Sequence, residues 1–143
     1  KRVVNLEKTN VKDLYPDYFD DEIDFICIDV SFISLKQVLP KASELLSDNG
    51  ELIALIKPQF EAGKKNLNKN GVVKDIRVHK AVLNDIISFS KEYFSVCSLT
   101  FSPIARKEGN IEYLVHLKKD GDSSDTDVSK VVDKAFKEVI FDK

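Results

Sequence analysis

Three charged residues of this chain stand where apolar segments begin or end, and their types suit proton transfer. Asp29 interrupts the apolar run that begins at Phe25, and Lys57 follows the apolar run Leu52–Ile56. Glu112 stands at the start of a third such run, directly after a Gly-Asn-Ile sequence. A lysine partly removed from water can accept a proton, and neighbouring carboxylates orient its amine. Such a cluster suits deprotonation of a hydroxyl group; the alternative is a set of salt bridges that ties three strand ends together.

Hydrophobic patterning predicts the strands that must position these residues. Continuous apolar runs of strand length are typical of strands buried on both faces of a sheet, and two segments have this character. The predicted strands are Lys1–Leu6, Phe25–Val30, Leu52–Ile56, Ser95–Phe101 and Ile111–Lys118.

Helices are predicted where apolar residues recur at three- and four-residue spacing. The first follows Leu35 with Pro40 near its start, and the turn sequence SDNG at Ser47–Gly50 ends it. The second begins after Asp75, which is a typical N-cap residue, and the last starts at Val128. Two polar stretches, residues 7–21 and the lysine-rich residues 58–71, are predicted to be loops.

The alternation of strands and helices predicts an α/β fold with a mostly parallel sheet and helices on both faces. In sheets of this kind, ligands bind at the carboxyl ends of the strands. Asp29 and Lys57 both occupy such ends, which makes them candidate site residues without reference to any family.

Composition limits the classes of function. The 143 residues suit one domain, and an apolar content of 43% suffices for a core. A net charge of −2 argues against a uniformly basic nucleic-acid binder but allows a local basic patch. Cys27 and Cys97 lie in apolar runs and are predicted to be reduced core thiols. His79 and His116 lack partners at metal-ligand spacing, so no metal is predicted. No apolar run is long enough to span a membrane and no signal peptide is visible, which favours a cytoplasmic protein.

Five sequence blocks resemble the catalytic domain of the FtsJ-like ribosomal RNA 2′-O-methyltransferases of the TlyA type, which are also called hemolysin A. In chain order the blocks are EKTNVKDL, DVSFISLKQVLP, LIKPQFEAG, GVVKDIRVH and SPI followed after four residues by GNIEYL. The resemblance implies a Rossmann-like fold that binds S-adenosylmethionine (SAM), with a Lys–Asp–Lys–Glu catalytic tetrad. Asp29, Lys57 and Glu112 match its last three members.

The resemblance also implies a reaction: in-line transfer of the SAM methyl group to a ribose 2′-hydroxyl of ribosomal RNA. Lys57 would act as the base or steer the hydroxyl, held by Asp29 and Glu112. Asp29 and Val30 would border SAM, and Thr9 with Asn10 matches a motif that lies beside the adenine. The implied cofactor is SAM, and the implied partners are ribosomal RNA and ribosomal subunits.

Several parts of the family pattern have no counterpart in this chain. The first tetrad lysine, the glycine-rich SAM loop and the acidic residue after the second strand would all lie upstream, as would an RNA-binding S4-type domain. The chain has five glycines and no G-x-G pair. We therefore expect an incomplete Rossmann-like methyltransferase fold that binds SAM weakly or not at all by itself. Its expected parts are residues 1–119, the C-terminal part of the methyltransferase domain; residues 120–127, a linker; and residues 128–143, an amphipathic helix packed on that domain.

An incomplete sheet would place Phe25–Val30 at an edge, and a long apolar edge invites pairing with another strand. We expect this edge to be covered by residues 3–6, by a second copy in a homodimer or by a rearrangement.

Basic residues near the candidate site suggest contact with RNA phosphates, the alternative being solvated loops. They are Lys64, Lys65, Arg106 and Lys107. His79 is expected to have a structural role. Two alternatives to the enzyme remain at this point: a hemolysin or cytolysin, and a non-catalytic RNA-interaction module with a methyltransferase-like fold.

Overall fold

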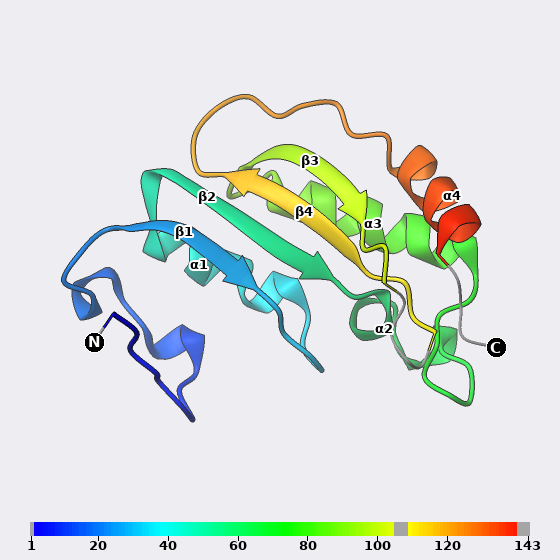
Figure 1. Ribbon diagram of the computed structural model, residues 1–143, viewed down its shortest axis with the longest axis horizontal. Helices are drawn as coiled ribbons and strands as arrows, with labels where there is room; N and C mark the ends of the chain where they lie inside the picture. The colour runs from blue at the N-terminus through cyan, green and yellow to red at the C-terminus, as the bar shows by residue number, and fades with distance from the viewer. Residues whose placement is uncertain (1, 105–108, 140–143) are drawn as a thin grey trace.

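The computed structural model describes residues 2–104 and 109–139, and its centre is a four-stranded sheet with strand order β1-β2-β4-β3. The strands are β1 (Ile23–Ile28), β2 (Leu46–Ile56), β3 (Ser95–Phe101) and β4 (Tyr113–Lys118). The helices are α1 (Leu39–Leu45), α2 (Pro58–Glu61), α3 (Ile76–Ser90) and α4 (Val128–Glu138). In Figure 1, α1 and α3 lie behind the sheet, and α4 lies against α3 near β3.

The sheet is less parallel than the sequence predicts. β1 and β2 run parallel, whereas β4 is antiparallel to both β2 and β3. The physical reason is the length of the connection: β3 and β4 are separated by residues 102–112, fewer than the dozen or more that a crossover between parallel strands needs.

One face of the sheet forms the core and the other is open. In β2 and β4, alternate side chains are fully buried and pair across the strands: Leu52 with Leu117, Ala54 with Val115, and Ile56 with Tyr113. Phe25 and Ile53 point to the opposite face and are exposed. The prediction of strands buried on both faces, and of helices covering both, is therefore wrong for the described residues.

The cysteine prediction is half right. Cys27 and Cys97 are free thiols, as expected, but Cys27 is exposed and Cys97 is only partly buried. Cys27 lies beside Ile28 on β1, and the pleat turns successive side chains to opposite faces. Because Ile28 faces the core, Cys27 faces outward.

The predicted helices form at the expected places. Pro40 lies in the first turn of α1, where its missing N–H is tolerated. The Asp75 carboxylate accepts a hydrogen bond from the Arg77 backbone N–H at 2.9 Å and so caps α3. Leu83 and Ile86 on the inward stripe of α3 are fully buried. Truncating either to alanine would destabilise the fold by roughly 2–5 kcal/mol.

The SDNG segment does not end the first helix as a separate turn. It lies inside β2, where the pairing with β1 jumps from Ile23 opposite Leu46 to Phe25 opposite Glu51. The turn-forming residues thus make an irregularity in the strand. Gly50 is required there, because a Cβ on it would stand 2.5 Å from the Leu46 side chain. The predicted loop after β2 likewise contains the short helix α2 and a 3-10 turn, Lys64–Asn66.

The amino-terminal segment does not form the predicted strand. Residues 2–6 have no regular structure, and Val3 and Val4 are exposed. β1 is an end strand, as expected, and within residues 2–104 and 109–139 it pairs only with β2. Residues 3–6 therefore do not cover this edge as a paired strand, and its pairing with a second copy stays a prediction.

The last helix packs on the rest of the fold. Val128, Val132 and Ala135 of α4 belong to the hydrophobic core, and the Phe136 ring stands edge-on to the His79 ring with centroids 4.9 Å apart. Asp127 caps the helix by accepting from the Lys130 N–H at 3.0 Å. The structure has a helix at residues 128–138. Residues 140–143 lie outside the described part, and the proposed domain division stays a prediction.

Candidate active site

The topology brings the three predicted residues to one edge of the sheet. β1 and β2 are parallel, so Asp29 and Lys57, each the first residue beyond its strand, lie at the same edge. β4 is antiparallel to β2, and its first residue, Tyr113, pairs with Ile56, the last residue of β2. Glu112 therefore reaches the same edge from the start of a strand.

Lys57 and Asp29 form the ion pair that the sequence predicts. The Lys57 amine donates to Asp29 Oδ1 and lies 3.3 Å from Ser31 Oγ. The lysine side chain is only 3% exposed, whereas that of Asp29 is 61% exposed. Lys57 has an extended backbone (φ −114°, ψ 97°), which the following Pro58 favours. The amine is thus withdrawn from solvent and held by a carboxylate that solvent can reach.

Glu112 is buried and is held by a residue that the sequence analysis missed. Gln59 Nε2 donates to Glu112 Oε1 at 3.1 Å. An ionised carboxylate only accepts hydrogen bonds, so this contact fixes which end of the amide faces Glu112. Gln59 Oε1 consequently points away, and it is buried without a hydrogen-bond partner among the described residues. It is an unused acceptor at the site.

A second polar network supports the chain around Glu112. Asn110 Oδ1 accepts from the Val73 N–H at 3.2 Å, and its Nδ2 donates to the Gly71 carbonyl at 3.1 Å. His79 Nε2 donates to the Val73 carbonyl at 2.8 Å, and Nδ1 accepts from the Tyr113 hydroxyl at 2.9 Å. Burial lowers the pKa of His79 below its ordinary value and raises that of Tyr113. These contacts fit the structural role expected for His79.

A cleft of about 540 Å³ opens beside the ion pair, and Gln59, Lys64 and Asn110 contribute to its lining. Phe32 and Phe60 form an aromatic wall, with ring centroids 4.8 Å apart. Phe32 is 90% exposed and has a φ of +63°, a left-handed conformation that is strained for a bulky residue. Strain of this kind clusters at functional sites. No sequence signal marks Phe32, because neither phenylalanine nor its neighbours favour that backbone shape.

Of the four residues predicted to contact RNA, two lie among the described residues, and one of these two lines the cleft. Lys64 is exposed and lines the cleft, whereas Lys65 is exposed but does not. Arg106 and Lys107 lie outside the described residues.

Thr9 and Asn10, the predicted SAM contacts near the amino terminus, form hydrogen bonds with residues close to them in sequence. Thr9 Oγ1 donates to the Glu7 carbonyl at 3.1 Å, and Asn10 caps a 3-10 turn by accepting from the Lys12 N–H at 3.0 Å. Val30 is half-buried at the end of β1, next to Asp29. Of the predicted catalytic residues, Asp29, Lys57 and Glu112 all lie at this one edge of the sheet.

A family model for FtsJ-like methyltransferases matches residues 1–119, which include all three site residues. The chain belongs to the FtsJ-like methyltransferase family. The resemblance seen in the five sequence blocks is thereby confirmed, and so is the methyltransferase fold.

Relatives of this FtsJ-like chain carry two kinds of name. It is 35% identical, over 85% of its length and 46% of the relative's, to a 16S/23S rRNA (cytidine-2′-O)-methyltransferase TlyA of Mycobacterium tuberculosis. It is 39% identical, over 80% of its length and 49% of the relative's, to hemolysin A of Brachyspira hyodysenteriae. A crystal structure of a protein from Lactococcus lactis, described provisionally as a hemolysin, superposes with a TM-score of 0.88 at 41% identity, over 95% of this chain and 67% of the other.

The chain spans about half the length of the curated relatives it matches. Within residues 2–104 and 109–139, no helix has the length and apolar character needed to cross a membrane. The same residues contain no cluster of three or more potential metal ligands.

Proposed function

We propose that this FtsJ-like chain forms part of a SAM-dependent enzyme that methylates ribose 2′-hydroxyls in ribosomal RNA. The observation that carries the proposal is the buried Lys57 amine, which is bonded to Asp29 at the sheet edge that also holds Glu112. The TlyA relatives, named as rRNA cytidine-2′-O-methyltransferases, support the substrate class. Such a substrate implies that the protein works in the cytoplasm, where ribosomes are.

Residues at this sheet edge are proposed to form one side of a methyl-donor pocket. SAM, when bound, supplies an electrophilic methyl group on a positively charged sulfur. The exposed Asp29 carboxylate would offer a counter-charge to this sulfur, and Val30, the next residue, is proposed to border the cofactor. Thr9 and Asn10 are proposed to lie near the adenine. Because the 143 residues contain no G-x-G pair to cradle the cofactor, we expect the chain alone to bind SAM weakly or not at all.

Lys57 is the residue proposed to act on the ribose hydroxyl. Its amine would steer the 2′-hydroxyl and, in its neutral form, accept the hydroxyl proton. The oxygen would gain the methyl group as the methyl–sulfur bond of SAM breaks and the cofactor leaves as a neutral thioether. Asp29 and Ser31 orient the amine from one side. Glu112, fixed by Gln59, is proposed to hold it from the other. Positioning of this kind supplies much of the rate enhancement in transfer reactions.

The cleft beside Lys57 has the chemistry of an RNA site. The exposed ring of Phe32, backed by Phe60, offers a face on which an unstacked base can lie. Lys64 supplies a positive charge for a phosphate at the same cleft.

The test is methyl transfer from radiolabelled SAM to purified ribosomal subunits by the full-length protein that carries this chain. Lys57→Ala is expected to lower the rate by about 100-fold or more, the usual contribution of a positioned proton acceptor. Lys137→Ala, on the exposed side of α4, is the matched control and should leave the rate unchanged. Equal rates for Lys57→Ala and wild type would remove Lys57 from its role.

The same assay separates the enzyme from a non-catalytic RNA module. A module would bind the subunits but transfer no label in any variant, wild type included. That outcome would refute the proposed function.

A further inference from the structure

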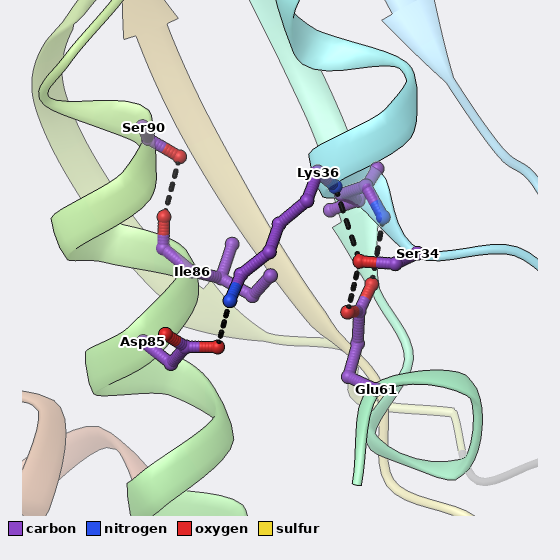
Figure 2. A network of polar contacts seen from close by, with 7 residues as sticks. Ser34, Lys36, Glu61, Asp85, Ile86 and Ser90 are labelled. Carbon is purple, nitrogen blue, oxygen red and sulfur yellow. Dashed lines mark hydrogen bonds and ion pairs between the residues drawn. The ribbon is translucent and has the colours of Figure 1, made fainter. Parts of the chain in front are cut away.

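Glu61 bridges the two loops that carry the ion pair. It ends α2, four residues after Lys57, and its carboxylate reaches across to the loop that follows Asp29. Oε1 accepts from the Leu35 backbone N–H at 2.8 Å, and Oε2 accepts from Ser34 Oγ at 2.7 Å. Figure 2 shows the carboxylate of Glu61 turned toward Ser34 from the opposite element.

The far end of the same loop is anchored by α3. The Lys36 amine lies 2.5 Å from Asp85 Oδ2 on α3, as Figure 2 shows, and 5.8 Å from the centroid of the Phe89 ring. Ser34 Oγ, which donates to Glu61, also accepts from the Lys36 backbone N–H at 3.1 Å. The loop is therefore held at one end by β1 and at the other by Glu61 and α3.

Two side-chain contacts link the segment after β1 to the segment after β2. The first is the ion pair of Asp29 with Lys57, and the second is the hydrogen bond of Ser34, five residues after Asp29, to Glu61. A shift of one segment past the other would disturb both links. The two segments are therefore linked at two points. The residues proposed to react form the first link, and Glu61 forms the second.

We propose that Glu61 is a positioning residue that holds the Asp29 and Lys57 loops in register and so keeps the Lys57 amine in place. The inference rests on the proposed function for its catalytic meaning. The structural part of the inference, that the Lys57–Asp29 ion pair depends on Glu61, does not rest on that function.

The two hydrogen bonds suit an ionised carboxylate, whose oxygens accept from both the Leu35 N–H and the Ser34 hydroxyl. Burial raises the pKa of Glu61, an effect that the hydrogen bonds from Leu35 and Ser34 oppose. Lys36 also opposes it, and Asp85 reinforces it. Asp75 and Arg77, at the start of α3, line the same cleft as Glu61.

The test reads the ion pair itself by NMR, without any methyl transfer. With ¹⁵N-labelled lysine, the hydrogen-exchange rate of the Lys57 side-chain ammonium is measured in wild type, Glu61→Ala and Glu61→Gln. Glu61→Ala removes two hydrogen bonds. We expect it to speed Lys57 exchange by about fivefold or more, as if the Lys57–Asp29 contact were weakened by the worth of one ordinary hydrogen bond. Glu61→Gln keeps an oxygen for Leu35 and should fall between the two. Amide protection in β4 confirms that each variant is folded.

Asp85→Asn is the matched control. It breaks the ion pair with Lys36 but leaves both hydrogen bonds of Glu61, so Lys57 exchange should stay near the wild-type rate. If Glu61→Ala does not fold, Glu61→Leu, which fills similar space without a hydrogen-bonding group, takes its place. An unchanged Lys57 exchange rate in the folded Glu61 variants would overturn the proposal. That failure is distinct from failure of the methyl-transfer assay, which does not involve Glu61.

Discussion

The buried amine of Lys57 is bonded to the exposed carboxylate of Asp29, each one residue beyond the end of neighbouring parallel strands. The two partners are therefore not equivalent. A buried amine that loses its carboxylate keeps the cost of desolvation without its compensation, whereas an exposed carboxylate that loses its amine is solvated by water.

This asymmetry predicts opposite effects on stability. Asp29→Asn should lower the free energy of unfolding by about 1–2 kcal/mol, less than for a fully buried pair because Asp29 is open to solvent. Lys57→Met replaces a buried charge by an apolar side chain of similar length and should leave stability equal or higher. Urea unfolding of the three proteins measures both. Equal losses in the two variants would contradict the asymmetry.

The buried His79 predicts a loss of stability in acid. Burial holds its pKa below the ordinary value of 6.5. Well above pH 6.5 the imidazole is neutral in both states and contributes no pH dependence. As the pH falls below 6.5, the unfolded chain takes up the proton first, so stability declines with a slope approaching about 1.4 kcal/mol per pH unit until the pKa of the folded state is passed.

Unfolding free energies measured from pH 8 downward in wild type and His79→Phe check this expectation. The part of the decline due to His79 should be missing in His79→Phe and retained in His116→Gln, in which only the histidine paired with Glu51 is changed. An identical decline in all three proteins would show that His79 does not cause it.

Lys64 is predicted to make a phosphate contact that is insensitive to sequence. Lys64→Ala should weaken binding of the full-length protein to ribosomal RNA and reduce the slope of log affinity against log salt by roughly 0.7–0.9, the share of one phosphate. Lys65→Ala, outside the cleft lining, should have the smaller effect, and Lys137→Ala none. Filter binding at several salt concentrations measures the slopes, and an unchanged slope for Lys64→Ala would remove it from the interface.

Sequence patterning was sufficient for the elements that carry Asp29 and Lys57. Each follows a long apolar run, and the carboxyl ends of adjacent parallel strands share one edge of a sheet. The start of α3 was equally predictable, because the capping hydrogen bond joins Asp75 to Arg77, only two residues further along the chain. Features of this kind can be predicted because they depend on residues that are close together in the sequence.

The features that were missed depend on distant partners. Glu61 bonds residues 26 and 27 positions away, and Gln59 bonds Glu112, 53 positions away, so no local pattern could indicate them. The predicted strand at Lys1–Leu6 failed for the same reason, since a strand forms only where an edge pairs with it. Cys27 was misplaced because an apolar run does not tell whether one or both faces of its sheet are covered.

The central claim is that Lys57 acts in 2′-O-methylation of ribosomal RNA, and single-turnover kinetics test it most directly. Ribosomal subunits are mixed with excess full-length protein and SAM, and 2′-O-methylribose is quantified by mass spectrometry of the digested RNA. We predict that wild type forms it at a stoichiometric site. Lys57→Met, folded and bound to the subunits, should form it about 100-fold more slowly or not at all. A wild-type rate in Lys57→Met, or no 2′-O-methylribose from wild type on any subunit, would contradict the account.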